Sequence, residues 1–418
     1  MSLTYDVAVV GGGVIGCAIA CELAERGVKV VLLERDRICS GASGAAAGML
    51  APQAEAHAPD PWFELLLAAR ADYEPLACRL RHDTGIDVGY RRDGVLRVAA
   101  GGVERSELRE RCEWQRRHGL AAEWLEPDEM LRLEPGLSPD LAGGLWLPDE
   151  AQVQSPRLVQ SLALLALRLG VDVREGTPVS GLQIADGRTA ELRPADGIGG
   201  LRQDGPAAAL DVSDLRRPHP DGPGQRQGGR SAGASGRVQG VLTPTERIST
   251  GAVVLAAGVW TPFIEGVDCL PVQPVKGQIV SGLQGAGCAP RHVVWGAGAY
   301  LVPKAGGELL VGATEEDGYD ARPTLGGISG LVAAGARLMP SLAGMPLNGA
   351  WAGLRPALPD RLPALGRLGG VEGLFAATGH YRNGVLLGPL SGKLMAQLVL
   401  GERPAHDLEP YSPARLTI

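Results

Sequence analysis

Residues 6–16 read DVAVVGGGVIG, and this stretch decides the fold. Its apolar run predicts a short buried strand, which the three glycines end. Residues 14–26 then have helical spacing, Gly27 interrupts them, and residues 28–34 (VKVVLLE) return to the pattern of a strand. A strand, a helix and a second strand in this order predict a parallel sheet covered by helices on both faces.

The turn between strand and helix has the spacing of a dinucleotide-binding site, G-x-G-x-x-G, at Gly11, Gly13 and Gly16. Gly11 permits the tight turn, Gly13 lets the backbone approach a pyrophosphate, and Gly16 lets helix and strand pack closely. Glu34, at the end of the second strand, is placed to accept hydrogen bonds from ribose hydroxyls. The alternative is a glycine-rich turn with a structural role only.

Residues 41–50, GASGAAAGML, carry no charge and no β-branched side chain. A buried flavin needs backbone N–H groups along its phosphates and against its ring, whereas NAD requires no such second segment. Met49 would pack at the ring, and four small residues would permit the approach: Ala42, Ser43, Ala47 and Gly48. The stretch by itself also fits a helix start packed against the sheet.

Two later segments favour FAD. Residues 251–260 (GAVVLAAGVW) predict a buried strand that ends at Gly258, and residues 373–400 predict another strand followed by a helix. A helix that starts near Val385 would direct its positive end at the strand ends, where it would stabilise the negative charge of a reduced flavin.

Other segments predict antiparallel strands joined by turns, at residues 94–100, 276–282, 292–304 and 307–316. The expected fold class is therefore α/β: a Rossmann-like FAD-binding domain with an inserted antiparallel-sheet substrate domain. We expect a discontinuous FAD-binding domain of residues 1–85, 146–265 and 351–418, and a substrate domain of residues 86–145 and 266–350.

Residues 186–236 are rich in Gly, Pro, Arg, Asp and Gln and nearly lack large apolar side chains. Such a segment cannot bury enough surface to offset its ordering entropy, so we expect a flexible insertion within the FAD-binding domain. A basic interaction tail is the alternative, although acidic residues are interspersed.

The composition limits the classes of partner and the compartment that we expect for this protein. The net charge of −7 over 418 residues gives no reason to expect nucleic acid or an anionic membrane surface. Seven scattered cysteines without a C-x-x-C predict neither a disulfide framework nor a metal site, and they fit a reducing cytoplasm. The apolar run of residues 7–21 is too short to span a membrane.

Taken together, the motifs resemble the D-amino acid oxidase superfamily of flavoproteins, and within it the branch that oxidises glycine for thiamine thiazole biosynthesis. The order of AAAGML (45–50), YLVP (300–303), AGLRP (352–356) and GHYRNGVLLGP (379–389) is specific to it. The insertion at 186–236 departs from the short loop that the resemblance implies.

The resemblance implies FAD contacts from several segments. These are Val14 and Ile15 at the helix start, Glu34 and Arg35 at the ribose, Ala42, Ser43 and Ala47 to Met49 along the flavin, Val179 near the adenine, and His380, Tyr381, Arg382, Asn383, Gly384, Val385 and Leu386 at the ring.

Substrate contacts centre on Arg355, which lies among apolar residues before a proline. A planar, permanently charged guanidinium suits a substrate carboxylate, and the alternative is a structural role, in an ion pair with Asp360 or in a cluster of carbonyl groups. The resemblance favours the carboxylate role. It adds Arg382 as a second contact, Tyr300 closing the pocket and Met49 beside it. We assign no catalytic acid or base: we expect His380 at the flavin without that role, and His57 in a surface loop.

The implied activity is FAD-dependent oxidative deamination of glycine, and of small amines such as sarcosine or D-alanine, to the imine. Oxygen would reoxidise the flavin to give H2O2, and the imine would supply the thiazole of thiamine. The resemblance also implies a homo-oligomer and thiazole-synthesis enzymes as partners. Two alternatives stay open: a D-amino acid dehydrogenase that reduces a quinone, and a flavin-binding protein without catalysis.

Overall fold

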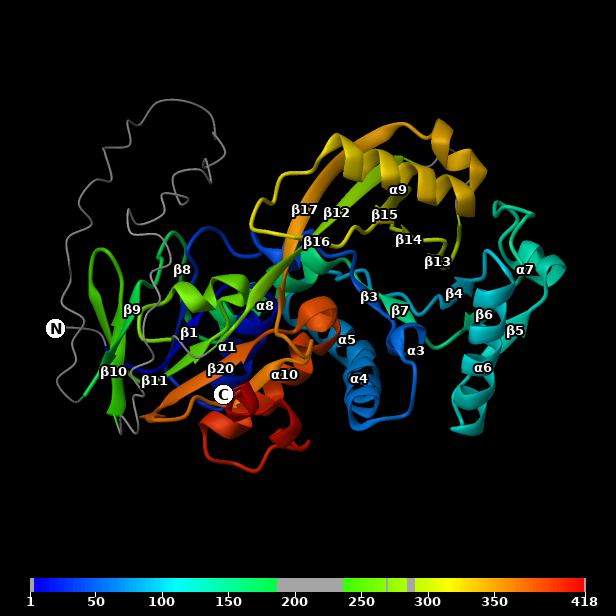
Figure 1. Ribbon diagram of the computed structural model, residues 1–418. Helices are drawn as coiled ribbons and strands as arrows, with labels where there is room; N and C mark the ends of the chain where they lie inside the picture. The colour runs from blue at the N-terminus through cyan, green and yellow to red at the C-terminus, as the bar shows by residue number, and fades with distance from the viewer. Residues whose placement is uncertain (1–3, 186–235, 268–269, 284–289, 417–418) are drawn as a thin grey trace, which may run out of the picture.

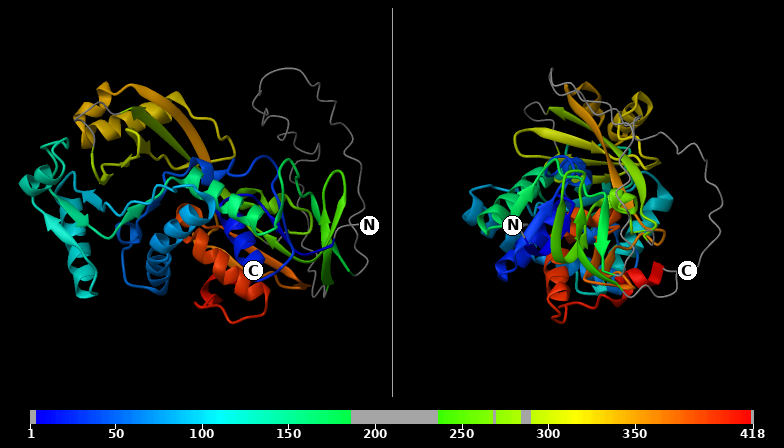
Figure 2. Two further views of the ribbon diagram at one scale, coloured as in Figure 1. Left: turned by 180° about the vertical axis from the view of Figure 1, so that it is seen from behind. Right: turned by 90° about the vertical axis from the view of Figure 1, so that its left-hand side faces the viewer.

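The computed structural model of the protein describes residues 4–185, 236–267, 270–283 and 290–416. Two large sheets lie at separate ends of the molecule (Figures 1 and 2). Each contains nine strands within the described ranges, and a two-stranded ladder of β3 and β7 lies apart from both.

The first sheet is built around β1, which pairs in parallel with β11 on one side and β2 on the other. The parallel order continues to β20 beyond β11 and to β8 beyond β2. β18 and the β9–β10 pair add antiparallel strands. Its strands are β1 (Thr4–Val10), β2 (Val30–Leu33), β8 (Asp172–Arg174), β9 (Gly181–Ile184), β10 (Gly236–Leu242), β11 (Arg247–Leu255), β18 (Ala364–Arg367), β19 (Val371–Glu372) and β20 (Leu374–Thr378).

Helices bury one face of this sheet, and strands and loops bury the other. The helices are α1 (Val14–Glu25), α4 (Pro61–Ala71), α5 (Tyr73–Thr84), α8 (Ser155–Arg168) and α10 (Gly384–Val399). The opposite core contains side chains such as Leu182 of β9, Val241 of β10 and Ile264. The prediction of helices on both faces is therefore wrong. In the described residues, the connection from β8 to β11 forms strands, so no helix is available on that side.

The second sheet confirms the strands predicted from residue 94 to 100 and from 276 to 316. Its pairs are antiparallel except β4 with β13, which run in parallel. Its strands are β4 (Val95–Val98), β5 (Glu123–Leu125), β6 (Gly144–Leu147), β12 (Gln273–Leu283), β13 (Val293–Gly296), β14 (Ala299–Pro303), β15 (Glu308–Gly312), β16 (Glu316–Asp317) and β17 (Leu347–Ala357).

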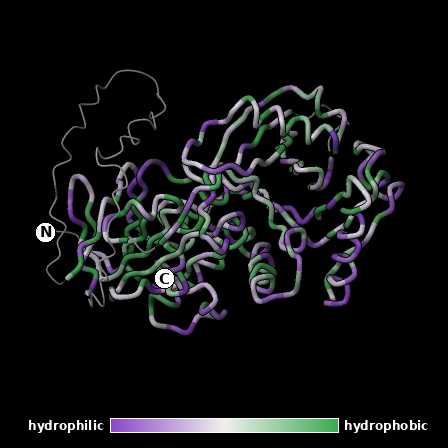
Figure 3. Tube along the Cα trace, in the orientation of Figure 1, coloured by the Kyte–Doolittle hydropathy of each residue, from purple (hydrophilic) through white to green (hydrophobic). Residues whose placement is uncertain are grey.

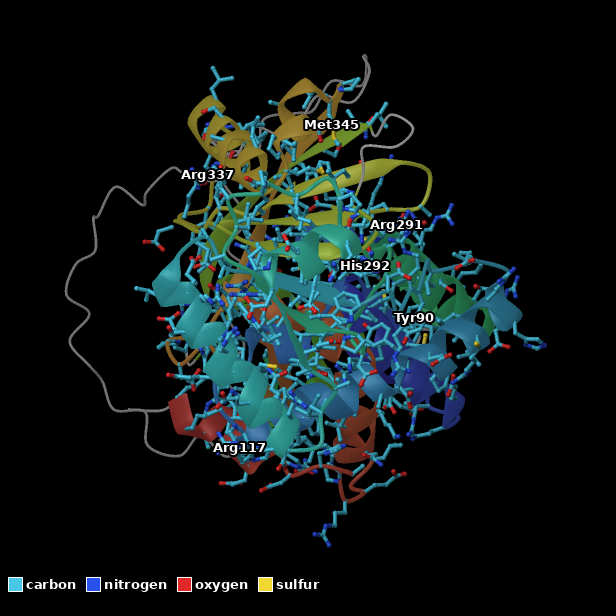
Figure 4. The ribbon with its side chains drawn as sticks, turned by 90° about the vertical axis from the view of Figure 1, so that its right-hand side faces the viewer. Tyr90, Arg117, Arg291, His292, Arg337 and Met345 are labelled. Atoms are coloured by element: carbon cyan, nitrogen blue, oxygen red, sulfur yellow. The ribbon has the colours of Figure 1, made fainter. Side chains whose placement is uncertain are left out.

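Three helices accompany this sheet: α6 (Gly102–Arg117), α7 (Pro127–Leu133) and α9 (Leu325–Leu338). α6 is largely hydrophilic, whereas hydrophobic residues are dense in the strands and helices of the first sheet (Figure 3). Arg117 at the end of α6 and Arg337 on α9 lie on the outside (Figure 4). Arg337 ties α9 to the β13–β14 turn by donating to the carbonyl of Ala297 at 2.9 Å.

The remaining elements are short: α2 (Ala42–Ala45), β3 (Met49–Leu50), α3 (Pro52–Glu55), β7 (Ala151–Gln152), and the 3-10 turns η2 (Gly258–Phe263), η3 (Pro340–Gly344), η4 (Tyr381–Asn383), η5 (Glu409–Tyr411) and η6 (Pro413–Leu416). β17 passes through the expected domain boundary at 350/351, so the division into domains stays a proposal. The flexible insertion predicted at 186–236 lies, apart from Gly236, outside the described residues. Within the described ranges, none of the helices combines the length and apolarity needed to cross a bilayer.

Candidate active site

A cavity of about 790 Å³ lies between the two sheets. Val10, Leu33 and Thr378 border it from the strand ends of the first sheet, and Ile279 and Tyr300 border it from the second. We call it the flavin cavity. All the predicted cofactor and substrate residues line it except Gly16 and Leu386: Gly11, Gly13, Val14, Ile15, Glu34, Arg35, Ala42, Ser43, Ala47, Gly48, Met49, Val179, Gly258, Tyr300, Arg355, His380, Tyr381, Arg382, Asn383, Gly384 and Val385.

The two exceptions are buried behind the cavity wall. A Cβ on Gly16 would lie 1.9 Å from the carbonyl oxygen of Gly11, so this glycine permits close packing of α1 on β1, as predicted. Leu386 is 2% exposed and packs in the helical core. Its side chain faces the protein interior, and its contact with the cofactor stays a prediction.

The glycine-rich turn has the geometry that its residues require. Gly11 has φ +114°, and a Cβ there would lie 2.5 Å from the carbonyl oxygen of Ala256. The carboxylate of Glu34 accepts from the backbone N–H of Gly12 at 2.6 Å and of Asp36 at 2.9 Å. Glu34 thus also holds the turn against the second strand. The sequence reasoning missed Gly12, whose role depends on the position of Glu34.

The small residues at 41–50 serve two purposes. Gly48 has φ +78°, and a Cβ there would lie 2.1 Å from the carbonyl oxygen of Val153, so only glycine brings this backbone to the cavity. Ala45 at the end of α2 accepts a hydrogen bond from the indole of Trp351 at 3.1 Å and packs against Gly353, both on β17. This stretch therefore borders the flavin cavity and also packs against β17 of the second sheet, while its contact with the cofactor stays a prediction.

Helix α10 begins at Gly384, within one residue of the predicted start, and its first turn lines the cavity. His380, just before it, is 2% exposed, and burial lowers its pKa to about 3. Its Nε2 lies 3.0 Å from the hydroxyl of Ser391. A neutral imidazole with so low a pKa is a weak base, which agrees with the expectation of no acid–base role.

Arg355 reaches the cavity from β17. Its Nη1 donates to the carbonyl of Thr314 at 3.1 Å, and no carboxylate of the described residues lies within 4.0 Å of its guanidinium. Asp360, the alternative partner, instead forms an ion pair with Arg415 at 2.7 Å. A Cβ on Gly277 would lie 2.2 Å from Nη2 of Arg355, so this glycine leaves room for the guanidinium. The arginine is therefore open to an anionic ligand.

Tyr300 and Arg382 line the flavin cavity near Arg355. Tyr300 on β14 is 8% exposed, and burial raises its pKa, so it keeps its proton at neutral pH. Arg382 lies 3.4 Å from a carboxylate oxygen of Glu55 and 3.1 Å from one of Glu315. The sequence reasoning missed both carboxylates, because nothing in their spacing from Arg382 marks them as partners. The contact of Arg382 with substrate stays a prediction.

The residues present fit FAD. The N-terminal turn of α1 borders the cavity, and such a turn is a site for phosphate groups. Gly11 and Gly48 make room where a Cβ would collide with neighbouring carbonyls. The cavity volume lies in the upper part of the range of about 300–1,000 Å³ typical of ligand pockets. A long ligand with a diphosphate, a ribose and a planar ring matches these features.

Comparisons with known proteins agree with FAD as the cofactor. The family described as FAD dependent oxidoreductase matches residues 6–203 and 227–398. The chain is 36% identical to the glycine oxidase of Geobacillus kaustophilus, over 99% of this chain and 98% of that protein. It is 33% identical to the bifunctional protein ThiO/ThiG of Synechocystis sp., over 99% of this chain and 54% of that protein.

Among solved structures, the glycine oxidase of Geobacillus kaustophilus superposes with a TM-score of 0.82 and 34% identity, covering 99% of both chains. The glycine oxidase of Bacillus cereus superposes with a TM-score of 0.78 and 30% identity, covering 95% of both. FAD is thus the cofactor of the cavity. The chain belongs to the family of FAD-dependent oxidoreductases and, within it, to the amino acid oxidases.

Proposed function

We propose that this enzyme oxidises glycine, and more slowly small amines such as sarcosine or D-alanine, to the imine, and that oxygen accepts the electrons to give H2O2. The observation that carries the proposal is Arg355, whose guanidinium lines the flavin cavity with no carboxylate partner among the described residues. Relatives named glycine oxidase, aligned over nearly the whole chain, support the choice of substrate.

The side chains at this end bind and orient a small amino acid. Arg355 presents a planar fork that matches a carboxylate, and Gly277 keeps that fork uncrowded. Tyr300, protonated at neutral pH, is a hydrogen-bond donor beside it. Arg382 is already neutralised by Glu55 and Glu315, so Arg355 is the stronger candidate for the substrate carboxylate.

Bound FAD supplies the redox chemistry, since it takes up two electrons from the substrate and passes them to oxygen. The protein contributes orientation, because fixing a substrate carboxylate at Arg355 restricts where the amine and the Cα–H lie. His380 is uncharged at neutral pH, and its ring lies beside the hydroxyl of Ser391. We therefore assign it no proton transfer.

We infer further that the imine from glycine supplies the thiazole of thiamine, with thiazole-synthesis enzymes as partners. Relatives named ThiO/ThiG support this role, because a counterpart of this chain makes up about half of each longer protein. D-Amino acid dehydrogenation with a quinone as acceptor is the main alternative.

Anaerobic mixing of the purified holoenzyme with glycine, sarcosine, D-alanine and D-proline tests the substrate. We expect glycine to bleach the flavin absorbance, and Arg355→Ala to abolish bleaching at the same glycine concentration. Arg117→Ala is the matched control, since Arg117 is exposed at the end of α6. Bleaching by none of the four compounds would refute the proposal.

The acceptor is tested separately by admitting oxygen to the glycine-reduced enzyme. We expect one H2O2 per glycine consumed. Rapid reduction by glycine without reoxidation by oxygen, but with reoxidation by a soluble quinone, would favour the dehydrogenase.

A further inference from the structure

A second cavity of about 390 Å³ adjoins the flavin cavity and shares Glu55, Tyr381, Arg382 and Asn383 with it. No predicted function accounts for it. Segments from five parts of the chain contribute its remaining lining: Ala54, His57, Trp62, Arg97, Arg111, Trp295 and Arg361.

The charges around this cavity do not balance. Four guanidinium groups and one carboxylate, that of Glu55, line it. Glu55 and Glu315 compensate Arg382, but no described carboxylate lies within 4.0 Å of Arg97, Arg111 or Arg361. On the same helix as Arg111, Arg105 and Arg109 both pair with Glu126. The missing counter-charge is therefore a local property of the cavity.

Arg97 and Arg111 converge on one acceptor. Their Nη1 atoms donate to the carbonyl of Ala54 at 3.1 and 2.8 Å. Arg111 is 9% exposed, and its Nη2 donates to Nδ1 of His57 at 2.9 Å. Since an arginine only donates, this contact requires a neutral His57. Burial and the charges of Arg111 and Arg97 lower the pKa of His57 accordingly.

Arg97 retains an unused donor. Its Nε is inaccessible to solvent and has no hydrogen-bond partner in the protein, which is an unfavourable state for a charged group. Burial and the neighbouring Arg111 lower the pKa of Arg97 to about 10. The guanidinium groups of Arg97 and Arg382 lie 4.4 and 5.3 Å from the ring centroid of Trp295, so both cations contact the same aromatic ring.

We propose that this second cavity is a binding site for a small dianion with oxygen ligands, such as inorganic phosphate or a short dicarboxylate. Three arginines without a carboxylate partner among the described residues give this cavity an excess of positive charge, which favours an anion with several acceptor oxygens. The site is separate from Arg355, and Arg382 lines both cavities, so the anion site adjoins the substrate end.

Isothermal titration calorimetry of the FAD-loaded enzyme tests the site, with inorganic phosphate in one arm and malonate in the other. We expect at least one of the two anions to bind at concentrations up to about 10 mM, and Arg97→Gln to weaken binding about tenfold or more, because a charge-assisted contact is lost. Arg97→Lys should retain part of the affinity. Arg117→Gln should bind as the unmodified enzyme does, and Arg355→Ala should keep the binding that Arg97→Gln loses. The flavin spectrum and circular dichroism report whether each variant is folded.

Absence of binding by both anions would overturn the proposal, and so would binding that Arg97→Gln leaves unchanged. Binding abolished by Arg355→Ala but kept by Arg97→Gln would place the anion in the flavin cavity instead. If Arg97→Gln fails to fold, Arg361→Gln at the exposed rim replaces it, with a smaller loss expected. These measurements need no turnover, so their failure is distinguishable from failure of the proposed oxidase activity.

Discussion

The two ends of the flavin cavity are built in different ways. At the nucleotide end, backbone from residues 11–15 and 41–49 forms the wall, and glycines are needed because a Cβ would collide with nearby carbonyls. At the substrate end, charged and aromatic side chains arrive from separate segments: Arg355 on β17, Tyr300 on β14, Arg382 on η4 and Glu55 on α3. The first end depends on backbone shape, and the second on the charge of a few side chains.

Arg355→Ala should have the largest effect and should act on substrate alone. Loss of one member of a buried, charged hydrogen-bonded pair costs about 2–5 kcal/mol, so kcat/KM for glycine should fall by about 30-fold to several thousand-fold. Arg415→Ala breaks a nearby ion pair with Asp360 and is the control. Steady-state kinetics with FAD content measured in parallel would test this. Equal losses in both variants would mean a structural effect.

Gly48→Ala should instead damage the cofactor end. The positive φ costs about 1–2 kcal/mol for a residue with a Cβ, and crowding against Val153 adds about 1–3 kcal/mol. Gly27→Ala is the matched control, because Gly27 has φ +79° but open space where its Cβ would lie. We expect a lower FAD content and melting temperature for Gly48→Ala than for Gly27→Ala. Equal values would show that backbone strain alone matters.

Protonation of the buried His380 should make the stability of the protein depend on pH. Its pKa falls from the ordinary value of 6.5 to about 3 on burial, so below pH 6.5 the unfolded chain binds a proton that the folded protein does not. Its contribution to stability is complete above pH 6.5 and is lost as pH falls toward 3, at about 1.4 kcal/mol per pH unit. Urea unfolding at pH 6.5 and 4.5 should therefore show a shallower loss in His380→Gln. The same slope in both proteins would contradict the assignment.

Glu315→Gln should have the smallest effect. It removes one of two carboxylates beside Arg382, and the Glu315 side chain is 42% exposed, so solvent weakens the pair. Such contacts contribute about 0–1 kcal/mol, and KM for glycine should change by no more than about fivefold. Glu55→Gln, at the less exposed partner, is the comparison variant. A change larger than that of Arg355→Ala would make Arg382 the main substrate contact.

The proposed anion site, like the substrate end, is built from side chains of separate segments. Arg97 and Arg111 lie on β4 and α6, far from any recognisable motif, and no spacing in the sequence connects them. Both side chains donate to the carbonyl of Ala54. This shared contact depends on the packing of α3 against the second sheet. Sequence reasoning found Arg355 through a resemblance, but it had no means of finding this cluster.

The sequence by itself determined the strand–helix–strand unit, the glycine turn with Glu34, the strands of the second sheet and the start of α10. These features depend on residues close together in the chain, whose periodicity and backbone requirements are local. Only the tertiary structure decided which face of the first sheet lacks helices, that Asp360 pairs with Arg415, and that Glu55 and Glu315 neutralise Arg382. Ion pairs and cavities depend on distances between segments that are remote in sequence, and packing of the whole chain sets those distances.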